Sequence, residues 1–187
     1  MNLLVLGPQG SGKGTQARRI ADAHGIPHVS TGDMFRAAIA ADTPLGQRVA
    51  PILASGELVP DELTVALIQA RLEEPDARSG FVLDGFPRNV EQADELDEML
   101  ASISRAIDHV LFFDLSDEIA AERMRGRAAA EGRADDTPEV IARRLAIYHE
   151  QTEPVVDRYR AAGVLSRLNA DRSVDEVFAE IEAALLQ

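Results

Sequence analysis

Cysteine is absent from this chain of 187 residues, and aromatic side chains make up only 4% of it. Without cysteine, neither a disulfide framework nor a thiolate metal site can form. Because aromatic rings are scarce, we expect Leu, Ile, Val and Ala to fill the core. No apolar run approaches the roughly 18 residues that a membrane-spanning helix requires, and the first residues lack the basic start and cleavage site of a signal peptide. These absences predict a cytoplasmic protein with no membrane partner.

Positively charged residues are also few relative to acidic ones, with 19 Lys and Arg against 32 Asp and Glu and a formal net charge of −13. Nucleic-acid-binding proteins usually present a broad basic face, so we expect no nucleic-acid partner. Eighteen of the 19 basic residues are arginine, and the only lysine is Lys13. Arginine is a poor substitute for lysine where a compact point charge must fit a tight space. Either the chain favours arginine throughout by composition alone, or position 13 requires a lysine.

Short apolar runs alternate with segments of helical periodicity along the chain. The apolar runs predict strands at residues 3–6, 28–29, 81–84, 109–115 and 164–168. The periodic segments predict helices at residues 13–24, 32–39, 45–54, 61–72, 90–100, 116–125, 138 to about 148, and from 174 onward. The last three begin at capping signals, which are Ser116, Thr137 with Pro138, and Ser173 with Glu176. Strands that alternate with helices indicate a parallel sheet covered on both faces, and without a repeat or composition break residues 1–187 should form a single domain.

Residues 7–13 read GPQGSGK and match the phosphate-loop pattern G-x-x-x-x-G-K between a predicted strand and a predicted helix. Glycines allow several backbone N–H groups to converge on an anion, and the helix N-terminus adds partial positive charge. Lys13 can then reach the β- and γ-phosphates of a nucleotide. Gly14 stands where this pattern commonly has a magnesium-binding Ser or Thr, and Thr15 follows one position later. A dinucleotide fingerprint is excluded, because Thr15 occupies the place of its third glycine.

This loop and four further segments resemble the nucleoside monophosphate kinase family, and adenylate kinases of the short-lid type in particular. The segments read GPQGSGKGTQ at residues 7–16, STGD at 30–33, GELVPD at 56–61, DGFPR at 84–88 and GRADD at 132–136. With Arg36, Gln92 and the RRL of residues 143–145, they cover most of the chain. The resemblance implies a three-layer α/β P-loop fold with a central parallel five-stranded sheet flanked by helices. It also implies a mobile AMP-binding helical insertion at residues 30–59 and a short lid at residues 126–136.

The resemblance further implies roles for individual residues on both sides of the phosphate loop. For ATP, it implies contacts from Gly10, Ser11, Gly12, Lys13, Gly14, Thr15, Arg123 and Arg127, with the adenine held by backbone around Arg172. For AMP, it implies contacts from Thr31, Arg36, Glu57, Leu58, Val59, Gly85, Phe86, Pro87, Arg88, Gln92, Arg133 and Arg144. The catalytic charges would be Lys13, Arg88, Arg123, Arg133 and Arg144.

Thr31 and Gln92 point to adenylate kinases within this family. The resemblance implies that their hydroxyl and amide read the adenine of AMP, since an amide pairs with adenine through one donor and one acceptor. UMP/CMP kinases look similar but usually carry Ala at the position of Thr31. Taken alone, Thr31 could instead be a helix N-cap and Gln92 a solvated helix residue.

Asp84 ends a predicted strand, where the resemblance implies a carboxylate that positions hydrated Mg²⁺ with ATP. Zinc is not expected, because relatives with a long lid bind it through cysteines, and this chain has a short lid and no cysteine. The family also tends to hold the bond equivalent to Phe86–Pro87 in the cis form. The histidines show no metal-ligand spacing, so we expect no catalytic or metal role for His24, His28, His109 and His149.

The reaction that these features predict is reversible phosphoryl transfer between ATP and AMP, giving two ADP. The acceptor phosphate is already anionic, so alignment and charge stabilisation suffice without a strong base. Residues 123–144 contain six arginines against four acids, although Arg125 and Arg143 read as ordinary surface residues. We expect a monomer whose two mobile segments close over the substrates.

Two alternatives stay open at this point. A UMP/CMP-type nucleoside monophosphate kinase would share most of the motifs. A P-loop switch protein is a remote alternative, because it needs an N-K-x-D guanine motif and the nearest string, LNAD at residues 168–171, has no lysine.

Overall fold

The structure is a computed structural model that describes residues 1–131 and 136–186. Its centre is one sheet of five parallel strands in the order β2-β3-β1-β4-β5. The strands are β1 (Asn2–Leu6), β2 (His28–Ser30), β3 (Phe81–Asp84), β4 (His109–Asp114) and β5 (Leu165–Asn169). The predicted parallel five-stranded sheet is therefore confirmed, and every predicted strand is present within two residues of its expected ends.

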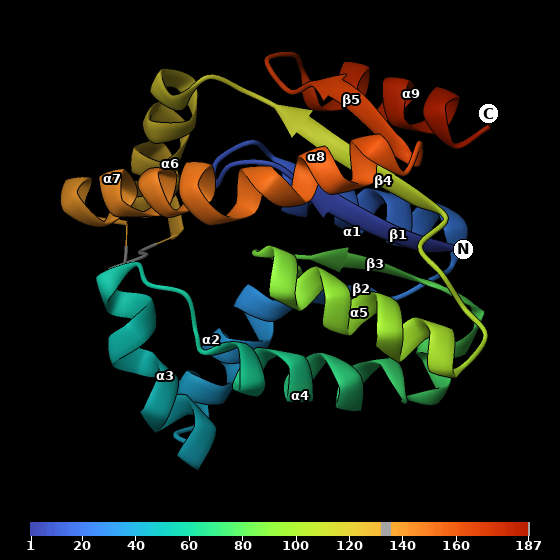
Figure 1. Ribbon diagram of the computed structural model, residues 1–187. Coiled ribbons are helices and arrows are strands. Elements are labelled where there is room, and N and C mark those ends of the chain that lie inside the picture. Colours follow the sequence, from blue (N-terminus) through green and yellow to red (C-terminus); the bar gives the residue numbers. More distant parts are fainter. Residues whose placement is uncertain (132–135, 187) are drawn as a thin grey trace.

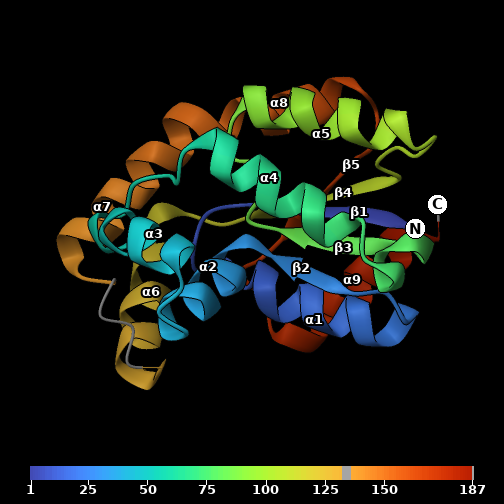
Figure 2. The same cartoon turned by 90° about the horizontal axis from the view of Figure 1, so that it is seen from below.

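Helices cover both faces of this sheet and make a three-layer fold (Figures 1 and 2). One face is covered by α1 (Lys13–His24) and α9 (Val174–Leu185). The other face is covered by α4 (Asp61–Leu72), α5 (Val90–Ser102) and α8 (Glu153–Ala161). Because side chains alternate along a strand, Leu4 and Leu6 of β1 pack into one layer, whereas Leu3 and Val5 pack into the other.

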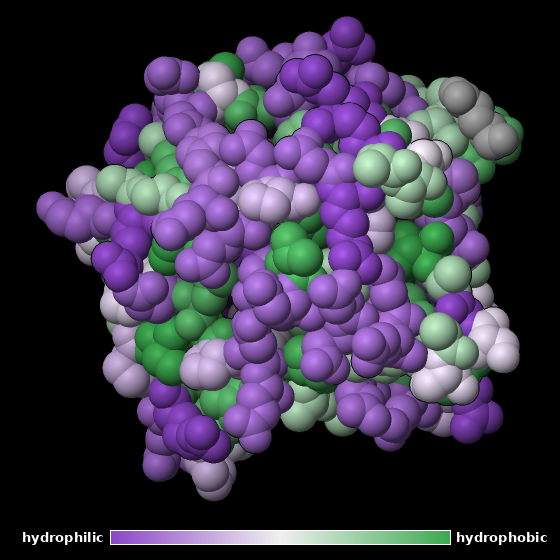
Figure 3. Space-filling model, viewed as in Figure 1, coloured by the Kyte–Doolittle hydropathy of each residue, from purple (hydrophilic) through white to green (hydrophobic). Residues whose placement is uncertain are grey.

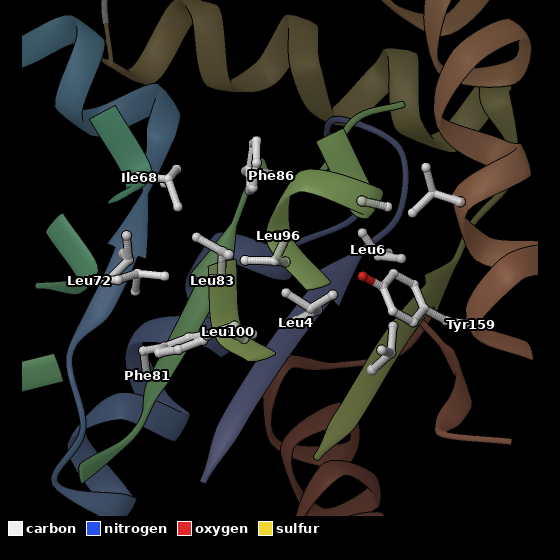
Figure 4. Packing of buried hydrophobic residues seen from close by; sticks show 14 of the residues in the cluster. Leu4, Leu6, Ile68, Leu72, Phe81, Leu83, Phe86, Leu96, Leu100 and Tyr159 are labelled. Carbon is white, nitrogen blue, oxygen red and sulfur yellow. The ribbon is translucent and has the colours of Figure 1, made fainter. Parts of the chain in front are cut away.

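The surface and the interior differ sharply in polarity. The face seen in Figure 3 is mainly hydrophilic, with small apolar areas scattered over it. Inside, aliphatic side chains from the sheet, α4 and α5 interdigitate around Phe81 and Phe86, as Figure 4 shows. Leu4, Leu83 and Leu96 are fully buried there. Burial of such side chains stabilises the fold by about 1.5–3 kcal/mol each.

Two helical pairs project from the end of the sheet where the strands finish (Figure 1). The first is α2 (Thr31–Ala40) with α3 (Pro44–Ser55), which pack around Phe35, Val49 and Val59. The second is α6 (Asp117–Glu131) with α7 (Pro138–Ile147), which pack around Met124, Ile141 and Leu145. Each pair has an apolar cluster separate from those of the sheet, so the two helices of each pair pack together as one unit.

Two helical segments differ from the predictions. The helix expected to end near Arg125 runs on to Glu131, because the sequence Ala128-Ala129-Ala130 has high helix propensity although it lacks an apolar stripe. Beyond α7, a π-helical turn (Tyr148–Thr152, η2) leads into α8, which the sequence reasoning did not anticipate. A 3₁₀ turn (Pro75–Ser79, η1) precedes β3.

In the described residues, we find no helix both long and apolar enough to span a bilayer.

Candidate active site

The phosphate loop connects β1 to α1 in the middle of the sheet. Gly10 adopts a φ of 85°, and a Cβ atom at this position would lie 2.5 Å from the carbonyl oxygen of Ala120, so only glycine fits. Gly12 is the N-cap of α1 in the left-handed conformation and supplies no side-chain cap. The first N–H groups of α1 are thus left for another acceptor, which suits an anion.

Lys13 begins α1, and its Nζ donates a hydrogen bond to the carbonyl oxygen of Pro8 at 3.1 Å. Burial lowers the pKa of Lys13 to about 8, and the nearby charges of Arg88 and Arg127 lower it too, whereas Asp84 raises it. A phosphate anion beside Nζ would favour the charged form again. The only lysine of the chain is therefore held where a strong anion would complete its surroundings.

Two adjoining cavities meet at this lysine. The cavity on the phosphate-loop side has a volume of about 200 Å³ and is lined by residues including Gly10, Gly12, Lys13, Gly14, Thr15, Arg123 and Arg127. The other cavity has a volume of about 140 Å³ and is lined by residues including Thr31, Arg36, Glu57, Leu58, Val59, Gly85, Arg88, Gln92 and Arg144. Both are lined by Lys13, Ser30, Arg36, Asp84 and Arg127. We call them the donor cavity and the acceptor cavity, after the phosphoryl donor and acceptor that the sequence resemblance predicts for them.

Asp84 lies at the boundary between the two cavities, at the carboxyl end of β3. Burial would raise the pKa of this carboxyl group, but His28, Lys13 and Arg88 outweigh burial and hold the pKa below its ordinary value. A Cβ atom on Gly14 would lie 3.2 Å from Asp84 Oδ2, so the glycine that departs from the common loop pattern leaves room for this carboxylate. Asp84 thus presents an ionised carboxylate at the boundary of the two cavities.

His28 was given no role from the sequence, yet its Nε2 lies 3.4 Å from Asp84 Oδ2. It is on β2, which pairs with β3 in parallel register. The sequence could have revealed this neighbour only if the pairing of these two strands had been known. His28 therefore belongs to the surroundings of the site, as one cause of the lowered pKa of Asp84.

The acceptor cavity is bounded by a close contact between α2 and the segment after β3. Thr31 Oγ1 donates a hydrogen bond to the carbonyl oxygen of Gly85 at 3.0 Å. Gly85 has a φ of 82°, and a Cβ there would lie 2.5 Å from Thr31 Oγ1. The Phe86–Pro87 peptide bond is cis, as expected. The Phe86 side chain packs into the core rather than into the cavity.

Arginines from separate elements converge on the acceptor cavity. Burial lowers the pKa of Arg88, and so do the positive charges of Arg144 and Arg36, while Asp84 opposes them. Arg88 Nε also donates to the carbonyl oxygen of Gly85 at 2.8 Å. Phosphate oxygens would add negative charge to this crowded set of guanidinium groups.

Asp136 joins the arginines of the two cavities. Its side chain is 0% exposed. Its Oδ2 accepts hydrogen bonds from Arg127 at 3.0 and 2.8 Å, and its Oδ1 pairs with Arg144. The sequence showed Asp136 only as one acid of the GRADD segment, although its place beside these arginines was a signal. The carboxylate holds Arg127, which lines both cavities, and Arg144, which lines the acceptor cavity.

The remaining predicted residues divide into those near the site and those apart from it. Arg123 lines the donor cavity and donates to the carbonyl oxygen of Ala170 at 2.9 Å. Arg172 is paired with Glu180 at 3.6 Å and is not among the described residues that line either cavity. Arg133 lies outside the described residues. Arg143, expected to be an ordinary surface residue, pairs with Glu57 and so connects α7 to the segment before α4.

Gln92 is almost fully buried at the wall of the acceptor cavity, with 2% of its surface exposed. It is not a solvated helix residue. Its Oε1 accepts from the backbone N–H of Arg88 at 2.8 Å, and its Nε2 donates to Asp61 Oδ1 at 2.7 Å. From the sequence, Asp61 was expected only to begin a helix, and its side chain was given no role in the site.

Comparison with known proteins decides the family. The adenylate kinase family model matches residues 5–164. The adenylate kinase of Xanthomonas euvesicatoria pv. vesicatoria is 48% identical over 185 residues, covering 99% of both chains. That of Stenotrophomonas maltophilia (strain K279a) is 48% identical with the same coverage, and that of Parvibaculum lavamentivorans is 48% identical over 99% of this chain and 92% of its own. This chain belongs to the adenylate kinase family.

The resemblance read from the five sequence segments is therefore confirmed, and with it the assignment to the nucleoside monophosphate kinases. Membership of the adenylate kinase family disfavours both the UMP/CMP-type alternative and the switch-protein alternative. The individual contacts to ATP and AMP stay predictions. The residues that line the two cavities indicate where each contact would be made.

Proposed function

We propose that this protein catalyses the reversible transfer of a phosphoryl group from ATP to AMP, giving two ADP. The main support is the pair of cavities that meet at Lys13, with a phosphate loop on one side and Thr31, Arg88 and Gln92 on the other. This arrangement suits two nucleotides whose phosphates point toward each other. The relatives with which the chain aligns over nearly its full length are named adenylate kinases.

In the proposed reaction, an oxygen of the AMP phosphate forms a bond to the γ-phosphorus of ATP. The bond from that phosphorus to the β–γ bridging oxygen breaks, and its electron pair stays on the departing ADP. No proton has to be removed from the acceptor, so the protein must align two polyanions and offset their repulsion. Lys13, Arg88, Arg123 and Arg144 supply this positive charge, and Arg133 is proposed to join them.

Mg²⁺ fits the residues at the boundary of the cavities. The low pKa of Asp84 keeps an anionic oxygen ligand there, and Mg²⁺ is commonly held by one or two carboxylates together with water and substrate phosphates. Among the described residues, no group of three or more His, Cys, Asp or Glu could hold a metal by itself. Asp84 would therefore hold hydrated Mg²⁺, which supplies charge neutralisation at the phosphate oxygens when bound.

Closure of residues 30–59 and of the lid at residues 126–136 is proposed to exclude water, which competes with AMP as an acceptor. The α6–α7 pair contacts the α2–α3 pair through Arg144 Nη2 with the carbonyl oxygen of Leu53 at 3.5 Å, and it contacts the segment between α3 and α4 through Arg143 with Glu57. The contacts join two units that have separate apolar clusters. We further propose that the protein is cytoplasmic. We also propose that it acts as a monomer, because the exposed large apolar residues of the described chain, Ile103, Val174 and Leu186, are few.

A panel of acceptors tests this function directly. ADP formation would be measured with ATP and Mg²⁺ and with AMP, UMP, CMP or GMP as the acceptor. We expect AMP to give the highest kcat/KM, and little ATP hydrolysis without an acceptor. A preference for UMP or CMP would overturn the proposal, and so would hydrolysis that no monophosphate accelerates.

A further inference from the structure

Behind the acceptor cavity lies a hydrogen-bonded network that joins the start of α4 to the start of α5. Asp61, the first residue of α4, accepts from Gln92 Nε2 at 2.7 Å. Its two oxygens also accept from Asn89 Nδ2, at 3.0 and 3.1 Å. Gln92 lines the cavity, whereas Asp61 is not among the described residues that do. Asp61 thus stands behind the residue that faces the nucleotide.

Every bond in this network has a fixed direction. The backbone N–H of Gln92 donates to Asn89 Oδ1 at 2.8 Å, and the backbone N–H of Arg88 donates to Gln92 Oε1 at 2.8 Å. A peptide N–H can only donate, so both side-chain amides must turn their oxygen atoms toward the backbone. Their NH₂ groups then face Asp61, and an ionised carboxylate can only accept. The network is satisfied in one orientation of each amide.

This fixed orientation determines what Gln92 can offer to a base. After the two observed bonds, its Oε1 retains one lone pair and its Nε2 retains one N–H. Adenine carries an amino donor at C6 beside a ring-nitrogen acceptor, which matches that pair. A 6-oxopurine such as hypoxanthine or guanine carries an oxygen acceptor at C6, which would face Oε1. A reversed amide would suit the oxygen, but it would set Nε2 against the Arg88 N–H and Oε1 against the carboxylate of Asp61.

We propose that Asp61 is a positioning residue that fixes the Gln92 amide and thereby makes the acceptor cavity select adenine over 6-oxopurine monophosphates. The inference rests on the proposed use of AMP as the acceptor. Asp61 touches neither nucleotide and acts through Gln92. Selectivity of this kind is strong when a mismatched base leaves buried polar groups unpaired, and Gln92 is buried.

The first test compares AMP with IMP as acceptor in the full-length enzyme, using ATP and Mg²⁺. IMP has the 6-oxo group without the 2-amino group of GMP, so it reports the orientation of the amide alone. Asp61→Asn keeps the shape of the side chain but introduces an NH₂ group that cannot accept. We expect the ratio of kcat/KM for AMP to that for IMP to fall about tenfold, which corresponds to the loss of roughly one hydrogen bond.

The matched control is Glu62→Gln, which removes one negative charge from the same first turn of α4 at an exposed position. It reproduces the loss of favourable charge at the helix N-terminus without touching the network. Its AMP-to-IMP ratio should equal that of the unmodified enzyme. Asp61→Ala serves as a second variant, and it should also lower the ratio because the anchor is lost. An unchanged ratio in a folded, active Asp61 variant would overturn the inference.

A double-mutant cycle separates orientation of the amide from a general effect on folding. In a Gln92→Leu background there is no amide to orient, so Asp61→Asn should leave the AMP-to-IMP ratio unchanged. The same fold-change in both backgrounds would show that Asp61 acts by another route. Failure of the proposed function would look different, because the unmodified enzyme would then make no ADP from ATP and AMP.

Discussion

The donor and acceptor cavities achieve recognition by different means. The donor cavity takes residues 10 and 12–15 from one contiguous stretch, and its other lining residues are Arg18, Ser30, Asp33, Arg36, Asp84, Arg123 and Arg127. The contiguous stretch offers backbone N–H groups and the only lysine of the chain. The acceptor cavity takes side chains from α2, from residues 57–59, from residues 85–92 and from α7. A phosphate needs only converging donors, whereas a base has a pattern of donors and acceptors that oriented side chains must match.

The largest expected effect is on the donor side, at Lys13. Lys13→Ala should lower kcat by about a hundredfold or more, since loss of one preorganised charged donor costs about 3 kcal/mol of transition-state stabilisation. Steady-state kinetics with both substrates varied would measure it. Arg125→Ala is the control, because this exposed residue of α6 lies between Arg123 and Arg127 in sequence but is not among the described residues that line a cavity. Near-normal turnover in Lys13→Ala would contradict the mechanism.

The next effect should involve both cavities, because Asp136 holds Arg127, which lines both, and Arg144, which lines the acceptor cavity. Asp136→Asn leaves Arg127 and Arg144 without their shared carboxylate. We expect a loss of about 2 kcal/mol in the free energy of unfolding, since hydrogen bonds to charged groups are worth about 1.5–3 kcal/mol, and a higher KM for both nucleotides. Urea denaturation and kinetics would measure these changes.

A matched control for this variant is Asp157→Asn, which breaks an exposed pair with Arg160. An exposed pair of this kind contributes less than about 1 kcal/mol. If Asp136→Asn raised the KM of only one nucleotide, or left stability unchanged, then Asp136 would not link the two cavities.

A smaller and one-sided effect is expected at Gln92. Gln92→Leu should raise the KM for AMP about tenfold, the worth of roughly one hydrogen bond, and leave the KM for ATP nearly unchanged. Initial rates with each substrate varied in turn would give both constants. The opposite pattern would mean that the donor and acceptor cavities had been exchanged.

The smallest effect lies away from both cavities, at His149 in the π-turn after α7. Hydrogen bonds with Asp117 at 2.9 Å and Glu153 at 3.1 Å raise the pKa of His149 above its ordinary value of 6.5. The stabilisation is therefore fully present below pH 6.5 and is lost as the pH rises through the raised pKa. His149→Gln should destabilise the protein by less than about 1 kcal/mol, because these groups are half-exposed.

Urea denaturation at about pH 5.5 and about pH 8.5 would measure this difference. The gap between His149→Gln and the unmodified protein should shrink at the higher pH. A gap that grew with pH would show that the neutral imidazole is the stabilising form. Kinetic constants for both nucleotides should stay unchanged, since this residue lines neither cavity within the described chain.

The contrast between the cavities also explains what could be predicted from the sequence. The phosphate loop was readable because strand, loop and helix are contiguous and each residue type has a local reason. The ends of α1 and α4 were also predicted correctly. The extension of α6 was missed because an alanine run has propensity without periodicity. Helix α8 is a short segment entered through a π-turn, and the proline in its first turn was a local start signal that went unused.

The supporting residues of the acceptor cavity were harder to foresee. Asp61 and Gln92 are 31 positions apart, and His28 and Asp84 come from strands whose pairing no local pattern gives. Their contacts depend on the order of strands in the sheet and on how α4 and α5 pack. Motif resemblance could name Gln92, but it could not say which way its amide faces. Only the direction of the backbone N–H groups decides that.

In the proposed function, one site holds two nucleotides end to end across Lys13. A crystal structure of the protein with a dinucleoside pentaphosphate, two adenosines joined by five phosphates, tests it most directly. We predict one ligand molecule per chain, with an adenine in each cavity and the phosphate chain between Lys13 and Arg88. A ligand confined to one cavity, or bound elsewhere on the surface, would contradict the account.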